Sequence, residues 1–181
     1  MTDIPDATST SALRAMAHPL RLRMLSLLTG SAMSAAEVAR ELGISQANAS
    51  YHLRVLARAG EVVEAGEEKV RGGVAKRYRH PWDAAEPMRR PDEGARRQQL
   101  RTMAAELERR GARRRPGGRN LTADAELWVT PDVRDRVLAL LTEAATLLHA
   151  EAQPPRTEGT GPLNLTLVAF EMTDDSEAGA R

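Results

Sequence analysis

The feature that most constrains the fold is a pair of short helical segments separated by only two residues, Gly43 and Ile44. In the first, SAAEVARELG, Ser34 is followed three residues later by Glu37, which is the pattern of a capping box. Gly43 is suited to end this helix, and Ser45 is suited to cap the next one. Two helices joined by so short a turn must cross steeply. The pattern therefore predicts a helix-turn-helix.

The second helix, SQANASYHLRVLARAG, has one apolar face and one polar face. Leu53 and Leu56 lie within about 40° of Ala49 around the helix, which predicts a buried stripe. The opposite face carries small, amide and arginine side chains, which can contact bases or phosphates in a major groove. The predicted DNA-contacting residues are Ser45, Gln46, Ala47, Asn48, Ser50, Tyr51, Arg54 and Arg58. For these residues alone, an ordinary solvated helix capped by Ser45 is the alternative. His52 is expected to be partly buried and structural.

A β-hairpin is predicted directly after these helices. The segments EVVEAGEEKV and VAKRYRH are rich in strand-forming valines, and the RGG between them favours a tight turn. A hairpin that follows a helix-turn-helix makes a winged helix. The predicted contacts of this wing with phosphates or the minor groove are Lys69, Arg71, Lys76 and Arg77.

Four segments follow one another over about residues 12–80: AMAHPLRLRMLSLL, SAAEVARELGIS, SQANASYHLRVLARAGEVVE and GGVAKRYRH. In these segments and their spacing the chain resembles the ArsR-type winged-helix transcriptional regulators. The resemblance implies a dimeric DNA-binding repressor that changes its DNA affinity when it senses an effector. Glu61 departs from the family pattern, which usually has a leucine after the glycine, so we expect looser packing where the wing begins.

The resemblance does not extend to the metal-sensing members of that family, which use a cysteine pair or clusters of Asp and His. The chain has no cysteine, and its histidines, His18, His52, His80 and His149, are scattered. We therefore expect no metal site and no cofactor, and a small molecule is the candidate effector. His149 with the nearby Glu151 is the weaker, metal-binding alternative to a solvated histidine at a helix end.

Charge is divided unevenly along the chain. Residues 1–120 hold 22 Lys and Arg against 14 Asp and Glu, a net charge of +8. Residues 121–181 hold 4 against 11, a net charge of −7. A basic part favours a polyanionic partner such as DNA, and an acidic part does not.

Several classes of protein are not expected. The chain has no phosphate-binding glycine loop, no HExxH and no GxSxG, so we do not expect an enzyme. Its apolar runs are too short to span a bilayer, and its first ten residues do not have the order of a signal peptide. The sequence therefore favours a cytoplasmic protein without a membrane partner.

The predicted organisation has five parts. Residues 1–10 are expected to be disordered, and residues 11–80 to form the winged helix-turn-helix DNA-binding domain. Residues 81–92, which contain three prolines, are the predicted linker. Residues 93–172 are predicted to form a dimerisation region that is also the candidate ligand-binding region. Residues 173–181 are predicted to be a disordered tail.

The C-terminal region is predicted to contain a helix at about 93–110 and a β-α-β unit, with strands at 126–129 and 163–170 around an amphipathic helix at 131–150. The predicted fold class is thus mainly α (α+β): a winged helix-turn-helix domain, a C-terminal helical dimerisation region and a small β-α-β unit. The candidate ligand pocket consists of Leu127, Trp128, Leu140, Leu147, Leu165 and Phe170. The favoured alternative is that these residues are ordinary core and interface.

The predicted function is that of a sequence-specific DNA-binding transcriptional regulator acting as a homodimeric repressor. Its expected partners are double-stranded operator DNA, a second copy of itself and a small-molecule effector. The alternative function is that of a winged-helix protein-interaction module without specific DNA binding.

Overall fold

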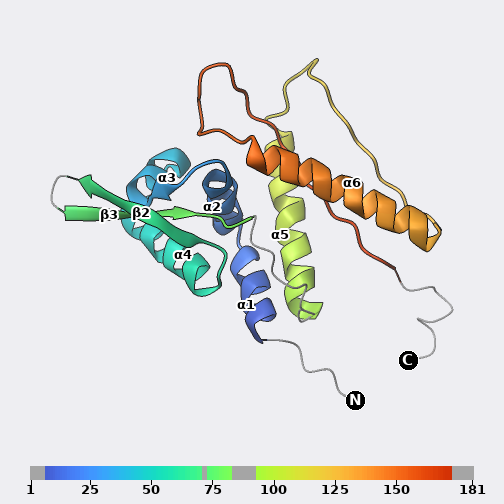
Figure 1. The fold of residues 1–181 in the computed structure, drawn as a ribbon, viewed down its shortest axis with the longest axis horizontal. Helices are drawn as coiled ribbons and strands as arrows, with labels where there is room; N and C mark the ends of the chain where they lie inside the picture. The colour runs from blue at the N-terminus through green and yellow to red at the C-terminus, as the bar shows by residue number, and fades with distance from the viewer. Residues whose placement is uncertain (1–6, 71–72, 83–92, 173–181) are drawn as a thin grey trace.

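The computed structural model describes residues 7–70, 73–82 and 93–172. Figure 1 shows how its elements are arranged. In chain order they are α1 (Ala7–Met16), α2 (Pro19–Gly30), β1 (Met33–Ser34), α3 (Ala35–Leu42), α4 (Gln46–Arg58), β2 (Val63–Val70), β3 (Gly73–Arg79), α5 (Glu93–Gly111) and α6 (Pro131–Ala150).

The first helix is longer than the sequence predicts. It begins at Ala7, so the expected disorder is wrong for residues 7–10, while residues 1–6 lie outside the described residues. Helix α1 packs against α5 as well as α2, and packing of this kind extends helices beyond what local propensity supports. Helix α2 spans the predicted residues, with Pro19 in its first turn.

The helix-turn-helix is confirmed. The capping box of α3 is formed: the Glu37 N–H donates to Ser34 Oγ over 3.4 Å, and the Ser34 N–H donates to Glu37 Oε2 over 2.7 Å. Gly43 ends α3 at a φ of +65°, a left-handed conformation that glycine adopts without strain. Ala39 is buried where α3 and α4 meet.

The wing is a three-stranded antiparallel sheet in the order β1-β3-β2. The predicted hairpin β2–β3 is confirmed, and residues 71–72 of its turn lie outside the described residues. The two-residue strand β1 was not predicted; it pairs Met33 with Tyr78 and Ser34 with Arg77. His80 fixes the base of the wing, since its N–H donates to the Leu28 carbonyl oxygen over 3.0 Å.

The core of the domain is aliphatic and lies between α2, α3 and α4. Its largest fully buried side chains are Met24, Leu28, Val38, Leu53 and Leu56. The predicted stripe of α4 is confirmed, because Ala49, Leu53 and Leu56 are at most 1% exposed. This stripe fixes the rotation of α4 and leaves its opposite face at the surface.

In the C-terminal half the predicted helices are confirmed, whereas the predicted strands are not formed. Helix α5 lies against α1 and α2, and α6 covers the predicted residues 131–150. The predicted strands at 126–129 and 163–170 are wrong, since both segments are extended but unpaired. Each lacks a neighbouring strand among the residues that the structure describes, and a two-stranded sheet is marginal in any case. The β-α-β unit is therefore not formed within the described residues, while the winged-helix fold class stands.

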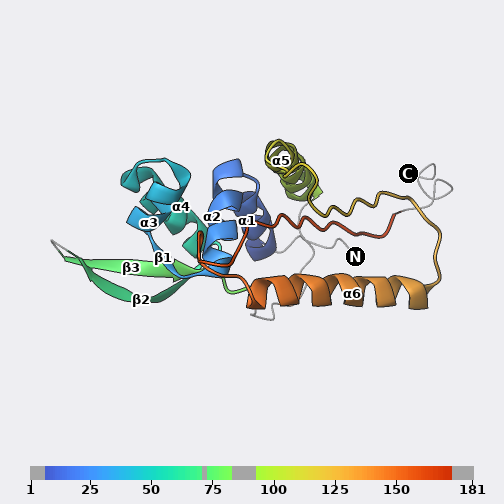
Figure 2. The ribbon, with the colours of Figure 1, turned by 90° about the horizontal axis from the view of Figure 1, so that it is seen from above.

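Helix α6 extends away from the winged helix-turn-helix, although α5 and the C-terminal end of α6 contact it. Figure 2 shows the hairpin, α3 and α4 at one end, and α6 projecting from the other. The predicted linker lies outside the described residues from position 83 to 92, as does the predicted tail at 173–181. None of the described helices has the length and hydropathy to cross a membrane.

Candidate DNA-binding surface

The polar face of α4 is continuous and exposed. Among the predicted residues of this face, Ser50 is half-buried. The exposed ones are Ser45, Gln46, Ala47, Asn48, Tyr51, Arg54 and Arg58. Tyr51 is 56% exposed, whereas Leu53, two residues on, is 1% exposed. The structure therefore leaves seven of the eight predicted residues exposed at the surface, around the side of α4 away from Ala49, Leu53 and Leu56.

The start of α4 is suited to an anion. Ser45 Oγ accepts a hydrogen bond from the Asn48 N–H over 3.2 Å, as its predicted cap role requires. The remaining N–H groups of the first turn point out of the helix, where the helix dipole favours a negative group such as a phosphate. Further along, Arg54 Nε donates to the Ser50 carbonyl oxygen over 3.2 Å, which holds the arginine against the helix.

His52 is buried on the inner side of α4, as expected for a structural residue. Its ring lies 4.8 Å from that of His18, which caps α2 by accepting from the Leu20 N–H at Nδ1. Burial lowers the pKa of His52, and the nearby His18 and Arg21 lower it further. Burial and Arg21 also lower the pKa of His18. The contact between α4 and the start of α2 therefore includes two imidazoles whose pKa values are lowered.

Two arginines of α2 are held by contacts within the chain. Arg21 donates to the carbonyl oxygens of Ala15 and Arg14 at the end of α1. Arg23 pairs with Glu106 of α5, with 3.1 Å between Arg23 Nε and Glu106 Oε1. These side chains join α2 to its neighbours and are not part of the α4 surface.

Arg77 of the wing is held by carboxylates of the same chain. Its Nη1 lies 3.1 Å from Glu37 of α3 and 2.6 Å from Glu68 of β2, and its Nη2 donates to the Ala32 carbonyl oxygen. Arg77 therefore ties β3 to the first helix of the helix-turn-helix. Lys76 makes an exposed ion pair with Glu64, with 2.7 Å between Nζ and Oε1.

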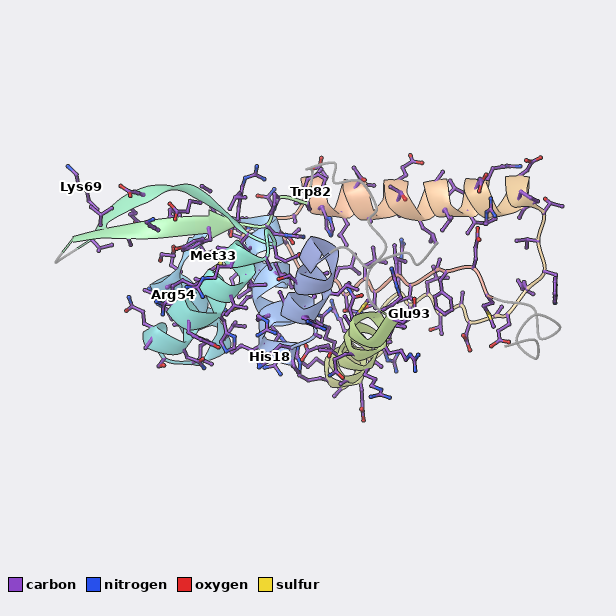
Figure 3. All side chains as sticks on the ribbon, turned by 90° about the horizontal axis from the view of Figure 1, so that it is seen from below. His18, Met33, Arg54, Lys69, Trp82 and Glu93 are labelled. Carbon is purple, nitrogen blue, oxygen red and sulfur yellow. The ribbon has the colours of Figure 1, made fainter. Side chains whose placement is uncertain are left out.

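Lys69 is the wing residue best placed for an outside contact. It is exposed on β2 near the outer end of the hairpin (Figure 3) and has no ion pair within the described part of the chain. Arg71 lies outside the described residues. The sequence analysis did not predict that carboxylates of β2 form ion pairs with Lys76 and Arg77. The sequence does contain a signal for these pairs, because Glu64, Glu67 and Glu68 precede a basic strand across a short turn.

The predicted pocket residues do not gather in a buried site of the single chain. All six are between 40% and 87% exposed: Leu127, Trp128, Leu140, Leu147, Leu165 and Phe170. The pocket remains a prediction. His149 is half-buried, with its ring 5.4 Å from that of Trp82, and no group of three His, Asp or Glu within the described ranges is placed to hold a metal ion.

The fold and the surface define a class of domain: a winged helix-turn-helix with an exposed polar recognition helix. Residues 16–63 match a family model described as a helix-turn-helix domain. No curated protein matched the chain. The family model and the geometry of α3 and α4 support a DNA-binding transcriptional regulator.

Several solved structures are similar to the chain, among them three of transcriptional regulators. One is a possible transcriptional regulator for arsenical resistance, with 26% identity over 58% of this chain and 97% of that chain and a TM-score of 0.33. The second is the homodimeric winged helix-turn-helix DNA-binding domain of a possible ArsR-family transcriptional regulator from Mycobacterium bovis, with 21% identity, coverage of 61% and 95%, and a TM-score of 0.36. The third is an ArsR-like transcriptional regulator from Rhodococcus sp. RHA1, with 25% identity, coverage of 78% and 93%, and a TM-score of 0.34.

Proposed function

We propose that this chain is a sequence-specific transcriptional repressor that binds operator DNA as a homodimer, with α4 in the major groove. The observation that carries the proposal is the division of α4 into a buried stripe, at most 1% exposed, and an exposed face of amide, hydroxyl and arginine side chains. A dimer would place two such helices in two half-sites related by its two-fold axis.

The side chains of α4 have distinct roles in this proposal. The amides of Gln46 and Asn48 suit adenine, and the guanidinium of Arg54 suits guanine. Ser45 and the first turn of α4 suit a phosphate. Lys69 suits a phosphate beside the groove, whereas Arg77 acts through its ion pairs with Glu37 and Glu68.

The first test is binding to a duplex of the chain's own promoter, and to a scrambled duplex of equal length, at increasing salt. We expect tighter binding to the promoter and a linear fall of log affinity with log salt concentration, because phosphate contacts release counterions. Weak binding that does not change with salt would contradict the proposal and favour the protein-interaction module.

Base recognition is tested by Gln46→Ala and Arg54→Ala. We expect each variant to lose much of the preference for the promoter over the scrambled duplex, by about tenfold to a hundredfold for a lost bidentate contact, while keeping most non-specific binding. Matched controls are Gln98→Ala and Arg96→Ala, which remove the same chemistry from exposed positions of α5. Equal losses on both duplexes would show that these α4 residues contact only the backbone.

Repression and its release form the finer part of the proposal. Because the chain has no cysteine, thiolate metal sensing is excluded, which supports a small-molecule effector. A reporter under the chain's own promoter should be more active when the gene is deleted, and should be silenced again by the wild-type chain but not by Gln46→Ala. Reduced reporter activity after the deletion would indicate an activator instead.

A further inference from the structure

Most of helix α6 is uncovered within the described part of the chain. It is 20 residues long, yet none of its residues is buried. Between Leu121 and Met172, fourteen large apolar residues are at least 40% exposed. The rest of the described chain has only five exposed large apolar residues. Monomeric proteins rarely expose contiguous apolar patches of more than a few hundred Å², so a surface of this kind indicates a partner.

The exposed side of α6 has the spacing of a helix-packing surface. Its apolar positions alternate at intervals of four and three residues, as in helices that pack side by side. We call these five exposed residues the α6 seam: Val133, Val137, Leu140, Ala144 and Leu147. Leu141, Ala145 and Leu148 lie between about 60° and 120° around the helix from the centre of the seam. Those three residues are half-buried, so they form the covered side of one broad apolar face, and the seam is its exposed side.

Two extended segments beside α6 also have no paired strand within the described residues. Residues 121–129 and 161–172 make no backbone–backbone hydrogen bond within the described chain. They carry exposed apolar side chains, of which Trp128 is 87% exposed and Phe170 is 66% exposed. Both segments run alongside α6 (Figures 1 and 2). Extended apolar segments with unpaired backbone groups are suited to pair with a strand of another chain.

We propose that a second copy of this chain covers this surface, with α6 packed on α6 along the seam and the extended segments paired across the interface. A second copy fits because it offers the same seam with the same spacing, and a two-fold axis makes one such patch complementary to another. A stable interface typically buries about 800 Å² per partner around an apolar centre, and the exposed apolar residues of α6 and of the two segments are suited to form such a centre. The net charge of −7 over residues 121–181 disfavours DNA or an anionic membrane as the occupant.

This interface would also set the distance between two DNA-binding domains. The C-terminal end of α6 is joined to its own domain by the Trp82–His149 ring contact and by the ion pair of Arg156 with Glu41 in α3. A dimer formed along α6 thus holds each α4 in a defined place relative to its counterpart. The inference rests on the homodimer of the proposed function and names the surface that builds it.

The test compares two alanines of α6 that receive the same charge. Ala144 belongs to the seam, whereas Ala139 is exposed about 120° away from its centre. By sedimentation of the full chain without DNA, we expect wild type and Ala139→Glu to have the mass of two 19.7-kDa chains, and Ala144→Glu that of one. Circular dichroism checks that all three remain folded.

A cysteine readout covers the case in which Ala144→Glu fails to fold. The chain has no native cysteine, so a single introduced thiol reports only its own contacts. Leu140 is the midpoint of the seam, so in a dimer whose two-fold axis passes through that midpoint it would lie nearest its counterpart. Leu140→Cys should form a disulfide-linked dimer on mild oxidation, and Ala139→Cys should not.

A wild-type chain that sediments as a monomer would overturn the inference, and so would a dimer in which Leu140→Cys does not cross-link. The proposed function is judged separately. A cross-linking dimer that binds no DNA contradicts the function and leaves the interface in place. A monomer with salt-dependent promoter binding contradicts the interface and leaves the DNA-binding function in place.

Discussion

At the scale of single residues, Glu106 shows how the basic residues of this chain are used internally. Its side chain is almost fully buried and pairs with Arg23 at 3.1 Å, Arg109 at 2.7 Å and Arg110 at 3.7 Å. Burial raises the pKa of Glu106, but hydrogen bonds from Arg109 and Arg23 outweigh this effect, so the pKa lies below its ordinary value. One carboxylate thus joins α5 to α2.

Replacing Glu106 tests this role. We expect Glu106→Gln to lower the free energy of unfolding by about 1–3 kcal/mol at pH 7, because charged hydrogen bonds are lost. A carboxyl whose pKa is depressed by folding stabilises the protein above its unfolded value, and that contribution is lost as the pH falls through the folded value. The difference between wild type and variant in urea denaturation should therefore shrink below about pH 4. Glu108→Gln, at an exposed position of α5, is the control, and equal losses in both variants would contradict the role.

The imidazole pair of His18 and His52 predicts a loss of stability in mild acid. Both pKa values are lowered in the folded chain, so the unfolded chain binds protons first as the pH falls below about 6.5. We expect Tm to fall between pH 7 and pH 5.5, and to fall less in His52→Phe, where one of the two groups is removed. Identical pH dependence in the two proteins would show that this pair does not titrate as described.

At the scale of elements, the wing is attached to the helix-turn-helix through Arg77. This residue lies opposite Ser34 of β1, pairs with Glu37 of α3 and also contacts Glu68 of β2. Since Ser34 and Glu37 form the capping box of α3, one guanidinium links the hairpin to the start of the first helix of the motif. The orientation of the wing therefore depends on α3.

We expect Arg77→Met to loosen the wing while the core remains folded. Methionine keeps much of the apolar stem but removes both ion pairs, so amide hydrogen exchange in β2 and β3 should become faster than in wild type. Lys76→Met is the matched control, because its exposed pair with Glu64 contributes little. Similar exchange rates in the two variants would argue against a special role for Arg77.

At the scale of the whole molecule, two surfaces of different character lie at opposite ends. The α4 face is polar and belongs to a part of the chain with a net charge of +8, whereas the α6 seam belongs to a part with a net charge of −7. The positive charge suits DNA, whereas the exposed apolar side chains of the seam suit an apolar partner such as a second copy. This separation allows both contacts to be made at once.

A dimer formed along α6 predicts that thermal stability depends on concentration. Association with the folded chain alone stabilises it by mass action, so Tm of the wild type should rise as the protein concentration is raised. The Tm of Ala144→Glu should stay constant over the same range, and Ala139→Glu should behave as the wild type does. A concentration-independent Tm in all three proteins would contradict the dimer.

Much of the DNA-binding domain was predictable because its signals are local. The capping box at Ser34 and the turn at Gly43 involve residues three or four positions apart, and the stripe of α4 repeats with the helical period. The wing followed from valine-rich segments around a glycine turn. Strand β1 escaped prediction because its two residues become a strand only through pairing with β3.

The sequence by itself determined helices α2 to α6, the caps of α3 and α4 and the polar face of α4, because capping and periodicity act within a few residues. Only the tertiary structure decided which basic residues are engaged internally. Arg77 meets Glu37 from 40 positions away, and Arg23 meets Glu106 from 83. It also decided that the apolar segments 126–129 and 163–170 remain unpaired in one chain, because a strand requires a neighbour and the pattern of a segment does not specify one.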